Sequence, residues 1–252
     1  WQKQNDTHET IQEYVENSIF LLSNEYTEVV VSGRTDAGVH ALNQVAHFDL
    51  KKTFSTKDIV KGLNYHLCGF FIKKNIELNK LAQTNLISYY NINCITIKSC
   101  EIVDETFHAR FSSISRFYRY IILNQYESST FDFNRVWLVR NSLNIEPMVR
   151  ASKYLLGKHD FTSFRSKECQ ALSPIKTLDE CNIKKEGNRI VFDLTARSFL
   201  HHMVRNIVGT LKDVGLGKKN AEDIPKILES KDTQKRGAMA PPCGLYIIGV
   251  AY

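Results

Sequence analysis

The sequence predicts an α+β fold with two similar subdomains that share a sheet. Strands and helices are mixed along the chain without a strict β-α-β alternation, which favours a sheet with helices packed outside it. Both halves show a loosely similar succession of elements, although no internal repeat proves a duplication. The 252 residues are 43% hydrophobic and 24% charged, values that exclude a disordered chain, a collagen and a coiled coil.

The first half is expected to contain two helices and three strands. Capping boxes mark the helix starts, Thr10 with Glu13 and Ser55 with Asp58, and apolar residues follow each of them at helical spacing. The strands are short apolar runs that end in loops. In chain order the expected elements are a helix at 11–22, strands at 29–31 and 39–50, a helix at 55–66 and a strand at 93–103. Residues 68–92 favour neither element, and we interpret them as an insertion.

The second half is expected to alternate strands and amphipathic helices. Its clearest signals are a hairpin that turns at residues 186–188 and a long helix that ends near Gly215 and Gly217. The expected elements are a strand at 116–123, a helix at 146–156 ending at Gly157, hairpin strands at 177–185 and 189–197, helices at 203–214 and 221–228, and a last strand at 245–251.

Composition limits the cellular compartment and the class of binding partner that we expect. No apolar run approaches 18 residues, so no membrane-spanning helix is expected. Six cysteines occur without C-x-x-C spacing, which argues against a zinc ribbon and favours free thiols in a reducing cytoplasm. The net charge of +6 favours an anionic partner, nucleic acid first.

A loop at residues 32–38 carries the strongest local signal of a site. Two glycines flank Arg34 and Asp36 directly after a buried strand, so both charged side chains are presented at the end of a sheet. The alternative is an ordinary surface turn in which Asp36 caps backbone amides, and the local pattern favours neither. The glycine spacing fits neither a dinucleotide-binding loop nor a Walker loop.

The same loop is part of a longer motif, SGRTDAGVHA at residues 32–41, which resembles the signature of the tRNA pseudouridine synthase A (TruA) family. Further segments resemble the family in the same chain order. They are WQKQ at 1–4, FHARF at 107–111, RFYRY at 116–120, FTSFR at 161–165, MVRN at 203–206 and PPCGLY at 241–246. The resemblance therefore covers most of the chain.

The resemblance implies both a fold and an activity. The fold is two ferredoxin- or RRM-like subdomains, at residues 1–105 and 106–252, that share a mostly antiparallel central sheet with an active-site cleft between them. The activity is isomerisation of uridine to pseudouridine in the anticodon arm of tRNA, at positions about 38 to 40. The enzyme would be a cytoplasmic homodimer that needs no cofactor and no metal.

Five residues are given active-site roles by the resemblance. Asp36 is the catalytic carboxylate, and Arg205 is the cation that opposes the cost of removing it from water. Tyr118 stacks on the target base, with a hydroxyl suited to taking the C5 proton, and Leu245 packs beside the base. Arg34 helps to extrude the target nucleotide. Attack at C1′, addition at C6 and removal of the C2′ proton all remain open as the role of the carboxylate.

A further set of polar residues is expected to contact the RNA backbone or stack on bases: Arg110, Arg116, Arg119, Arg165, Lys176 and His202. His201 and His202 are not expected to bind a metal. Adjacent residues of a helix point about 100° apart, and no spacing in the sequence supplies a further ligand.

The sequence departs from the family in two places. The family has a strand before the segment at residues 1–4, so we expect a chain trimmed at its N-terminus, and it lacks the insertion at 68–92. Two other functions are less well supported. A catalytically silent RNA-binding protein is disfavoured because Asp36, Tyr118 and Arg205 are all present, and a phosphate-handling hydrolase because neither a metal-ligand set nor a phosphate loop is found.

Overall fold

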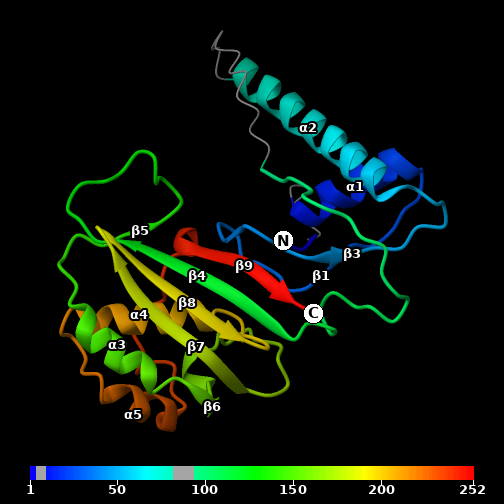
Figure 1. The fold of residues 1–252 in the computed structure, drawn as a ribbon. Coiled ribbons are helices and arrows are strands. Elements are labelled where there is room, and N and C mark those ends of the chain that lie inside the picture. Colours follow the sequence, from blue (N-terminus) through cyan, green and yellow to red (C-terminus); the bar gives the residue numbers. More distant parts are fainter. Residues whose placement is uncertain (4–9, 82–93) are drawn as a thin grey trace. The chain divides into compact units, whose positions relative to one another are not determined.

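The computed structural model describes residues 1–3, 10–81 and 94–252, and they form two compact units (Figure 1). Unit 1 comprises Trp1–Arg34 and Ala46–Phe111, and unit 2 comprises Thr35–Val45 and Ser112–Tyr252. The loop that carries Asp36 is therefore built into unit 2. The subdomain limits expected at residues 105 and 106 stay a prediction.

Unit 1 is organised around two helices that pack against each other. Its elements are α1 (Ile11–Ser23), β1 (Val30–Val31), β3 (Ala46–His47) and α2 (Thr56–Leu81), and β1 pairs antiparallel with β3. Thr10 caps α1 as predicted, because its hydroxyl accepts a hydrogen bond from the Glu13 amide at 3.2 Å. A small core of Val15, Ile19, Val29 and Leu63 joins the two helices.

Helix α2 is longer than the sequence predicts. It continues past residue 66 to Leu81, through the first part of the expected insertion, because residues 67–81 contain no proline and only Gly69 to interrupt a helix. The rest of the expected insertion, residues 82–92, lies outside the described residues.

Two strand predictions in this region were wrong. The strand expected at 39–50 is replaced by two short strands in different sheets, β2 (His40–Ala41) and β3. Residues 94–103 form no strand. The Asn64 side chain of α2 instead pairs with both backbone groups of Ile97, at 2.8 Å each, so a side chain takes the place of a neighbouring strand.

The described residues of unit 2 contain a mostly antiparallel seven-stranded sheet. Its order is β2-β9-β4-β8-β7-β6, with β5 paired to β4, and only the β2–β9 and β4–β5 pairs are parallel. The strands are β4 (Ser115–Leu123), β5 (Trp137–Leu138), β6 (Gly157–Asp160), β7 (Ile175–Glu186), β8 (Arg189–Ala196) and β9 (Leu245–Ala251). The predicted α+β class is confirmed, as are the hairpin and the last strand.

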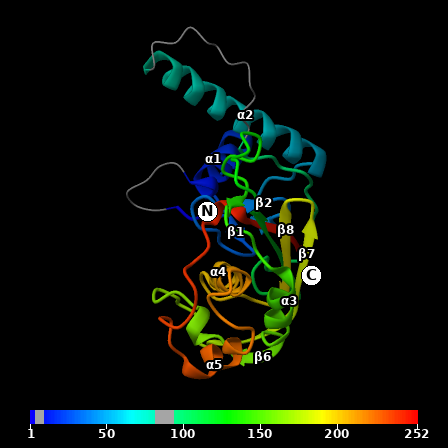
Figure 2. The same cartoon turned by 90° about the vertical axis from the view of Figure 1, so that its left-hand side faces the viewer.

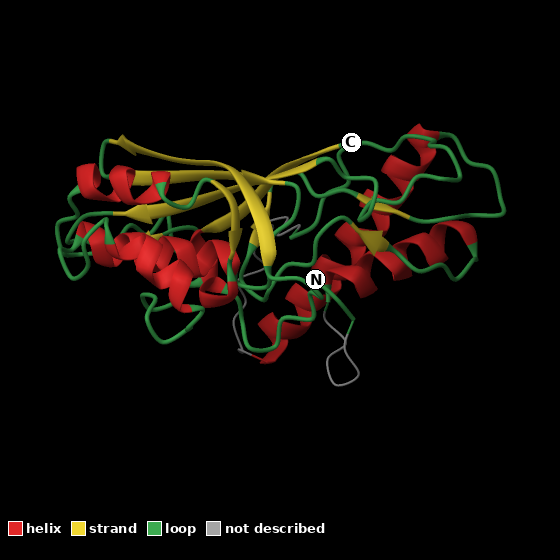
Figure 3. Ribbon diagram, turned by 90° about the horizontal axis from the view of Figure 1, so that it is seen from below, coloured by secondary structure: helices red, strands yellow, loops and turns green. Residues whose placement is uncertain are grey.

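Helices pack against this sheet and enclose the main core (Figures 2 and 3). They are α3 (Ile145–Lys153), α4 (Met203–Gly215) and α5 (Asp223–Ser230), with short 3-10 turns η1 (Thr162–Phe164) and η2 (Pro242–Gly244). Every residue of α4 except Lys212 and Asp213 is buried, so this helix is a central element of the unit. No helix in the described part of the chain has the length and hydrophobicity to cross a membrane.

Helix α4 makes an unusually close approach to the segment that precedes η2. At Gly209 an added Cβ would lie 1.8 Å from the Ala238 carbonyl oxygen, so only glycine fits there. The Ala240 amide donates a hydrogen bond to the Arg205 carbonyl at 3.1 Å. The backbone of residues 238–240 is thus held directly on the face of α4.

We predict that Gly209→Ala will destabilise the protein by about 2 to 3 kcal/mol, because the backbone of residue 238 must move away from the helix. Thermal unfolding followed by circular dichroism should show Tm lowered by roughly 5 °C or more. Gly69→Ala is the matched control, since a Cβ at that helical position meets no atom within 4 Å. Equal Tm values for the two variants would contradict the close packing at Gly209.

Candidate active site

A tight turn presents the Asp36 side chain. The Val39 amide donates to the Asp36 carbonyl at 3.2 Å, and Gly38 occupies the turn with a φ of +78°. A side chain at that φ is strained, and a Cβ there would also lie 3.1 Å from the Pro242 ring. Directly after the turn, β2 pairs in parallel with β9. The loop is therefore fixed at its end by the sheet of unit 2.

The N-terminus of α4 brings two histidines to the same carboxylate. His202 is the N-cap residue of the helix and has a φ of 65°, outside helical geometry. This backbone turn brings the His201 and His202 rings together in a tilted arrangement, with centroids 3.8 Å apart. The His201 carbonyl also accepts a hydrogen bond from the Ser166 amide at 2.9 Å, which fixes the segment in front of the helix.

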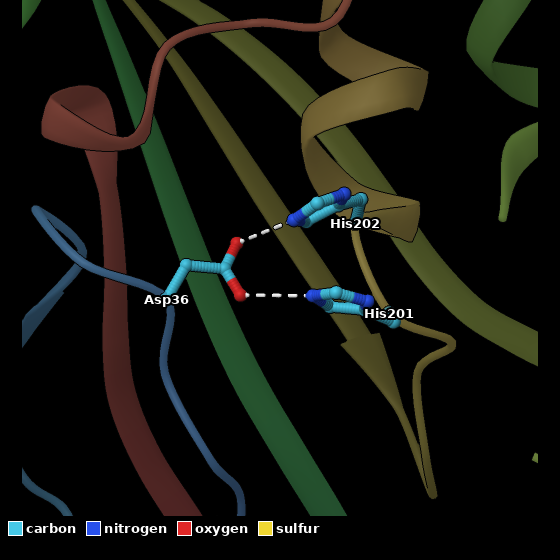
Figure 4. Close-up of side chains that lie close together, drawn as sticks. All are labelled: Asp36, His201 and His202. Carbon is cyan, nitrogen blue, oxygen red and sulfur yellow. Dashed lines mark hydrogen bonds and ion pairs between the residues drawn. The ribbon is translucent and has the colours of Figure 1, made fainter. Parts of the chain in front are cut away.

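Figure 4 shows both rings directed at Asp36. His201 Nε2 lies 3.2 Å from Asp36 Oδ1, and His202 Nε2 lies 3.1 Å from Oδ2. The side chain of Asp36 is 27% exposed, so a ligand can reach the carboxylate although it is largely surrounded by protein.

Arg205 completes the arrangement. Its Nη1 lies 2.7 Å from Asp36 Oδ2, so the ion pair expected between these two residues is present. The guanidinium is only 8% exposed, and its Nε donates to the Ala240 carbonyl at 2.8 Å. A charge-assisted hydrogen bond and the positive end of the α4 dipole both stabilise the ionised carboxylate.

His202 is a neutral partner of this carboxylate. Its burial is the main cause of a pKa below the usual 6.5, outweighing the opposing effect of the Asp36 charge. Its Nε2 lies 3.1 Å from Asp36 Oδ2, so the uncharged ring is in contact with the carboxylate. His202 therefore orients Asp36 without adding a positive charge near neutral pH.

The expectation that His201 and His202 point apart was wrong. It placed both residues in a helix, where neighbouring side chains diverge, but both precede the first helical residue and converge on Asp36. Among the described residues, the ligand atoms of these three side chains lie within 4.8 Å of one another, a spacing and donor set that could hold a transition metal. Arg205 already contacts Asp36 Oδ2, and its charge opposes a cation there. The expected absence of a metal stays a prediction.

Tyr118 lies in β4 beside this group. A bulge in the β4–β9 pairing falls between Phe117 and Tyr118, and the tyrosine ring packs edge-on against Phe199 with centroids 4.9 Å apart. Burial raises the pKa of Tyr118 to about 12, and the charge of Asp36 acts in the same direction. Near neutral pH the hydroxyl of Tyr118 is therefore protonated.

Comparison with known proteins gives the family. A family model described as tRNA pseudouridine synthase matches residues 151–252. Over all 252 residues the chain is 44% identical to a tRNA pseudouridine synthase A from Ehrlichia chaffeensis, 43% identical to one from Ehrlichia canis and 42% identical to one from Wolbachia pipientis wMel. Each alignment spans 94% of the relative. The chain belongs to the tRNA pseudouridine synthase A family. Pseudouridine synthases are isomerases, so this chain is an enzyme of that class.

The other residues assigned from the family resemblance fall in several places. Arg34 is exposed and ends the first stretch of unit 1. Arg110, also exposed and in unit 1, lies over the Phe111 ring with Cζ 5.6 Å from its centroid. Leu245 is buried in the main core of unit 2, opposite Tyr120 in the sheet.

Two of the arginines expected to contact RNA bind other groups of unit 2. Arg116 is buried and donates to the Arg197 carbonyl, and Arg119 forms a two-point ion pair with Asp193 at 2.7 and 3.0 Å across the sheet. Arg165 follows η1, and Lys176 lies in β7. The RNA-binding roles of all these residues stay predictions.

Two parts of the site were not predicted from the sequence. The first is the contact of His201 and His202 with Asp36, which the adjacent pair of histidines ahead of Arg205 signals only if the helix start is placed after them. The second is the Ala240 carbonyl that orients Arg205, and a backbone group leaves no sequence signal.

We predict that His202 makes the protein less stable as pH falls. The pKa of His202 in the folded state lies below that of the unfolded chain, about 6.5, so near pH 6 the unfolded state binds more protons and stability rises with pH. The free energy of unfolding should therefore fall more for wild type than for His202→Gln between pH 7.5 and pH 5.5. An NMR titration of the His202 ring, with a midpoint below 6.5, checks the cause. Parallel losses of stability in the two proteins would rule the idea out.

Proposed function

We propose that this chain isomerises uridine to pseudouridine in the anticodon arm of tRNA, at positions about 38 to 40, with Asp36 as the catalytic residue. Membership of the tRNA pseudouridine synthase A family supports the reaction and the substrate class. The observation that carries the residue assignment is the ion pair of Asp36 with Arg205 at the start of α4. It places a cationic guanidinium directly against a partly exposed carboxylate that a ligand can reach.

The reaction breaks the bond between C1′ and N1 and forms a bond between C1′ and C5. The proton on C5 is lost, and N1 gains a proton, so the product is an isomer of the substrate. An ionised carboxylate can assist in three ways: by attack at C1′, by addition at C6, or by removal of the C2′ proton. Each route requires Asp36 to be unprotonated and close to the ribose and the base.

The neighbours of Asp36 fit this requirement. Arg205 and His202 both face Oδ2, and His201 faces Oδ1, so the carboxylate has a fixed orientation before substrate arrives. Tyr118 offers a ring face for stacking on the base. Because its hydroxyl stays protonated at neutral pH, it is better suited to donating a hydrogen bond than to accepting the C5 proton.

Access to the target requires the nucleotide to leave the helical stem. Arg34, exposed and two residues before Asp36, is proposed to assist this step. A homodimer and a cytoplasmic location, both implied by the family resemblance, stay predictions; light scattering on the purified protein measures the oligomeric state.

We predict that Asp36→Asn will abolish pseudouridine formation while binding to tRNA persists, because the amide keeps the shape of the carboxylate but not its charge or nucleophilicity. The measurement is pseudouridine mapping on an unmodified tRNA transcript with uridines in the 3′ side of the anticodon stem. Asp179→Asn, the same change at an exposed position of β7, is the control and should retain wild-type turnover.

Two results would count against the proposal. Turnover by Asp36→Asn close to wild type would remove Asp36 from the chemistry. Binding without product in the wild-type protein would instead favour a silent RNA-binding protein. Arg205→Gln should also reduce product strongly, since it removes the charge that stabilises Asp36.

We predict that a chelator will leave turnover unchanged. Asp36, His201 and His202 have the chemistry of a metal site, but the proposed reaction uses the free carboxylate, which the Arg205 guanidinium already partners. The measurement is the initial rate of pseudouridine formation before and after dialysis of the protein against EDTA. Both assays use the same magnesium-free buffer, so that the state of the RNA is the same in each. A loss of rate that added zinc restores would show that these three residues act through a metal.

A further inference from the structure

A cavity of about 450 Å³ opens in unit 2 beside the proposed catalytic group. Its walls come from the segment that follows η1 and from the segment between α5 and η2. The charged side chains that line it are Arg165, Lys167 and Arg236, together with the carboxylate of Glu168. Its volume lies in the range of small-ligand sites, large enough for a phosphate group with part of a nucleotide.

The cations of this cavity lack anionic protein partners. Among the described residues, none of Arg165, Lys167 and Arg236 forms an ion pair. Arg236 Nη1 donates to the adjacent Gly237 carbonyl at 3.0 Å, but the buried Nε has no hydrogen-bond acceptor in the part of the chain that the structure describes. Burial lowers the pKa of Arg236, the direction expected of an unpaired buried charge. Three cations against one carboxylate, with a buried donor left open, fit an anionic ligand.

His202 connects this cavity to Asp36. It lines the cavity, and its Nε2 lies 3.1 Å from the Asp36 carboxylate. The Ser166 amide, at the cavity wall, also binds the carbonyl of His201. His202 is therefore a side chain that borders the cavity and also contacts the Asp36 carboxylate.

We propose that this cavity binds a backbone phosphate of the RNA, within two nucleotides of the target uridine. The inference rests on the proposed function for the identity of the ligand, but the cavity and its open cations are features of the structure itself. Arg236 and Arg165 bind the phosphodiester, and Lys167 contributes positive charge at the edge of the cavity. The sugar that follows the phosphate then passes His202 and lies close to Asp36. The cavity sets the register of the strand and leaves recognition of the base to the side chains near Asp36.

The test pairs a charge removed from the protein with a charge removed from the RNA. An anticodon-arm hairpin carries a single neutral methylphosphonate linkage, moved one position at a time across the two linkages on each side of the target uridine. Binding is measured by fluorescence anisotropy at one fixed salt concentration, with the full chain. This readout does not depend on turnover.

At one of these positions the methylphosphonate is expected to weaken binding of the hairpin to wild-type protein about tenfold. In Arg236→Gln the same linkage should change binding less than twofold, because the partner charge has gone. Arg140→Gln removes an exposed arginine outside the cavity, and should keep the tenfold effect. Lys167→Gln, an exposed position that cannot disturb packing, should reduce the effect in part.

Equal sensitivity of wild type and Arg236→Gln at every linkage would overturn the proposal. A second result would also overturn it. If inorganic phosphate or 5′-UMP binds to wild type and not to Arg236→Gln, while Arg236→Gln alters the effect of no methylphosphonate linkage, the cavity binds a free anion and not the RNA backbone. If the coupling is found but no pseudouridine is formed, the cavity assignment stands and the proposed reaction fails. If pseudouridine is formed without any coupling, the proposed reaction stands and the cavity assignment fails.

Discussion

The site depends on a single guanidinium that is held at both ends. Arg205 Nε binds the Ala240 carbonyl and Nη1 binds the Asp36 carboxylate, while the Arg205 carbonyl accepts from the Ala240 amide. A flexible arginine loses side-chain entropy when it is ordered, and the contacts of Nε with Ala240 and of Nη1 with Asp36 order it before any ligand is present. The missing side chain at Gly209 is what allows the segment that carries Ala240 to come close enough.

The carboxylate is positioned just as firmly from the other side. Gly38 permits the turn that exposes Asp36, and the β2–β9 pairing fixes the chain that leaves the turn. The two histidines then fill the space in front of α4, and the lowered pKa of His202 keeps that residue uncharged. Arg205 and the helix end supply positive charge towards Asp36 that is not easily lost as pH changes.

Helix caps, turn glycines and apolar runs predicted much of the fold, because these elements are determined by residues close together in the sequence. Thr10 caps α1, Gly187 turns the hairpin with a φ of +59°, and the last strand runs from Leu245 to Ala251 as expected. The failures have tertiary causes. Asn64 replaces a strand partner for Ile97, and the φ of 65° at His202 moves the start of α4 past both histidines. The Asp36–Arg205 pair was expected only through the family motif, since 169 positions separate the two residues in sequence and no periodicity relates them.

Thr35–Val45, the segment that carries Asp36, lies in sequence between the two stretches of unit 1 but belongs to unit 2 in space. A fragment that begins at Ser112 would keep Arg205, the histidines and the cavity, yet it would lack the carboxylate that they face. It would also leave the free edge of β9 open where β2 now pairs, and an uncovered edge of this kind invites association with other chains. An autonomous version of this half would need the short 35–45 segment joined back to it, for example through a circular permutation that links that segment to the strand it pairs with.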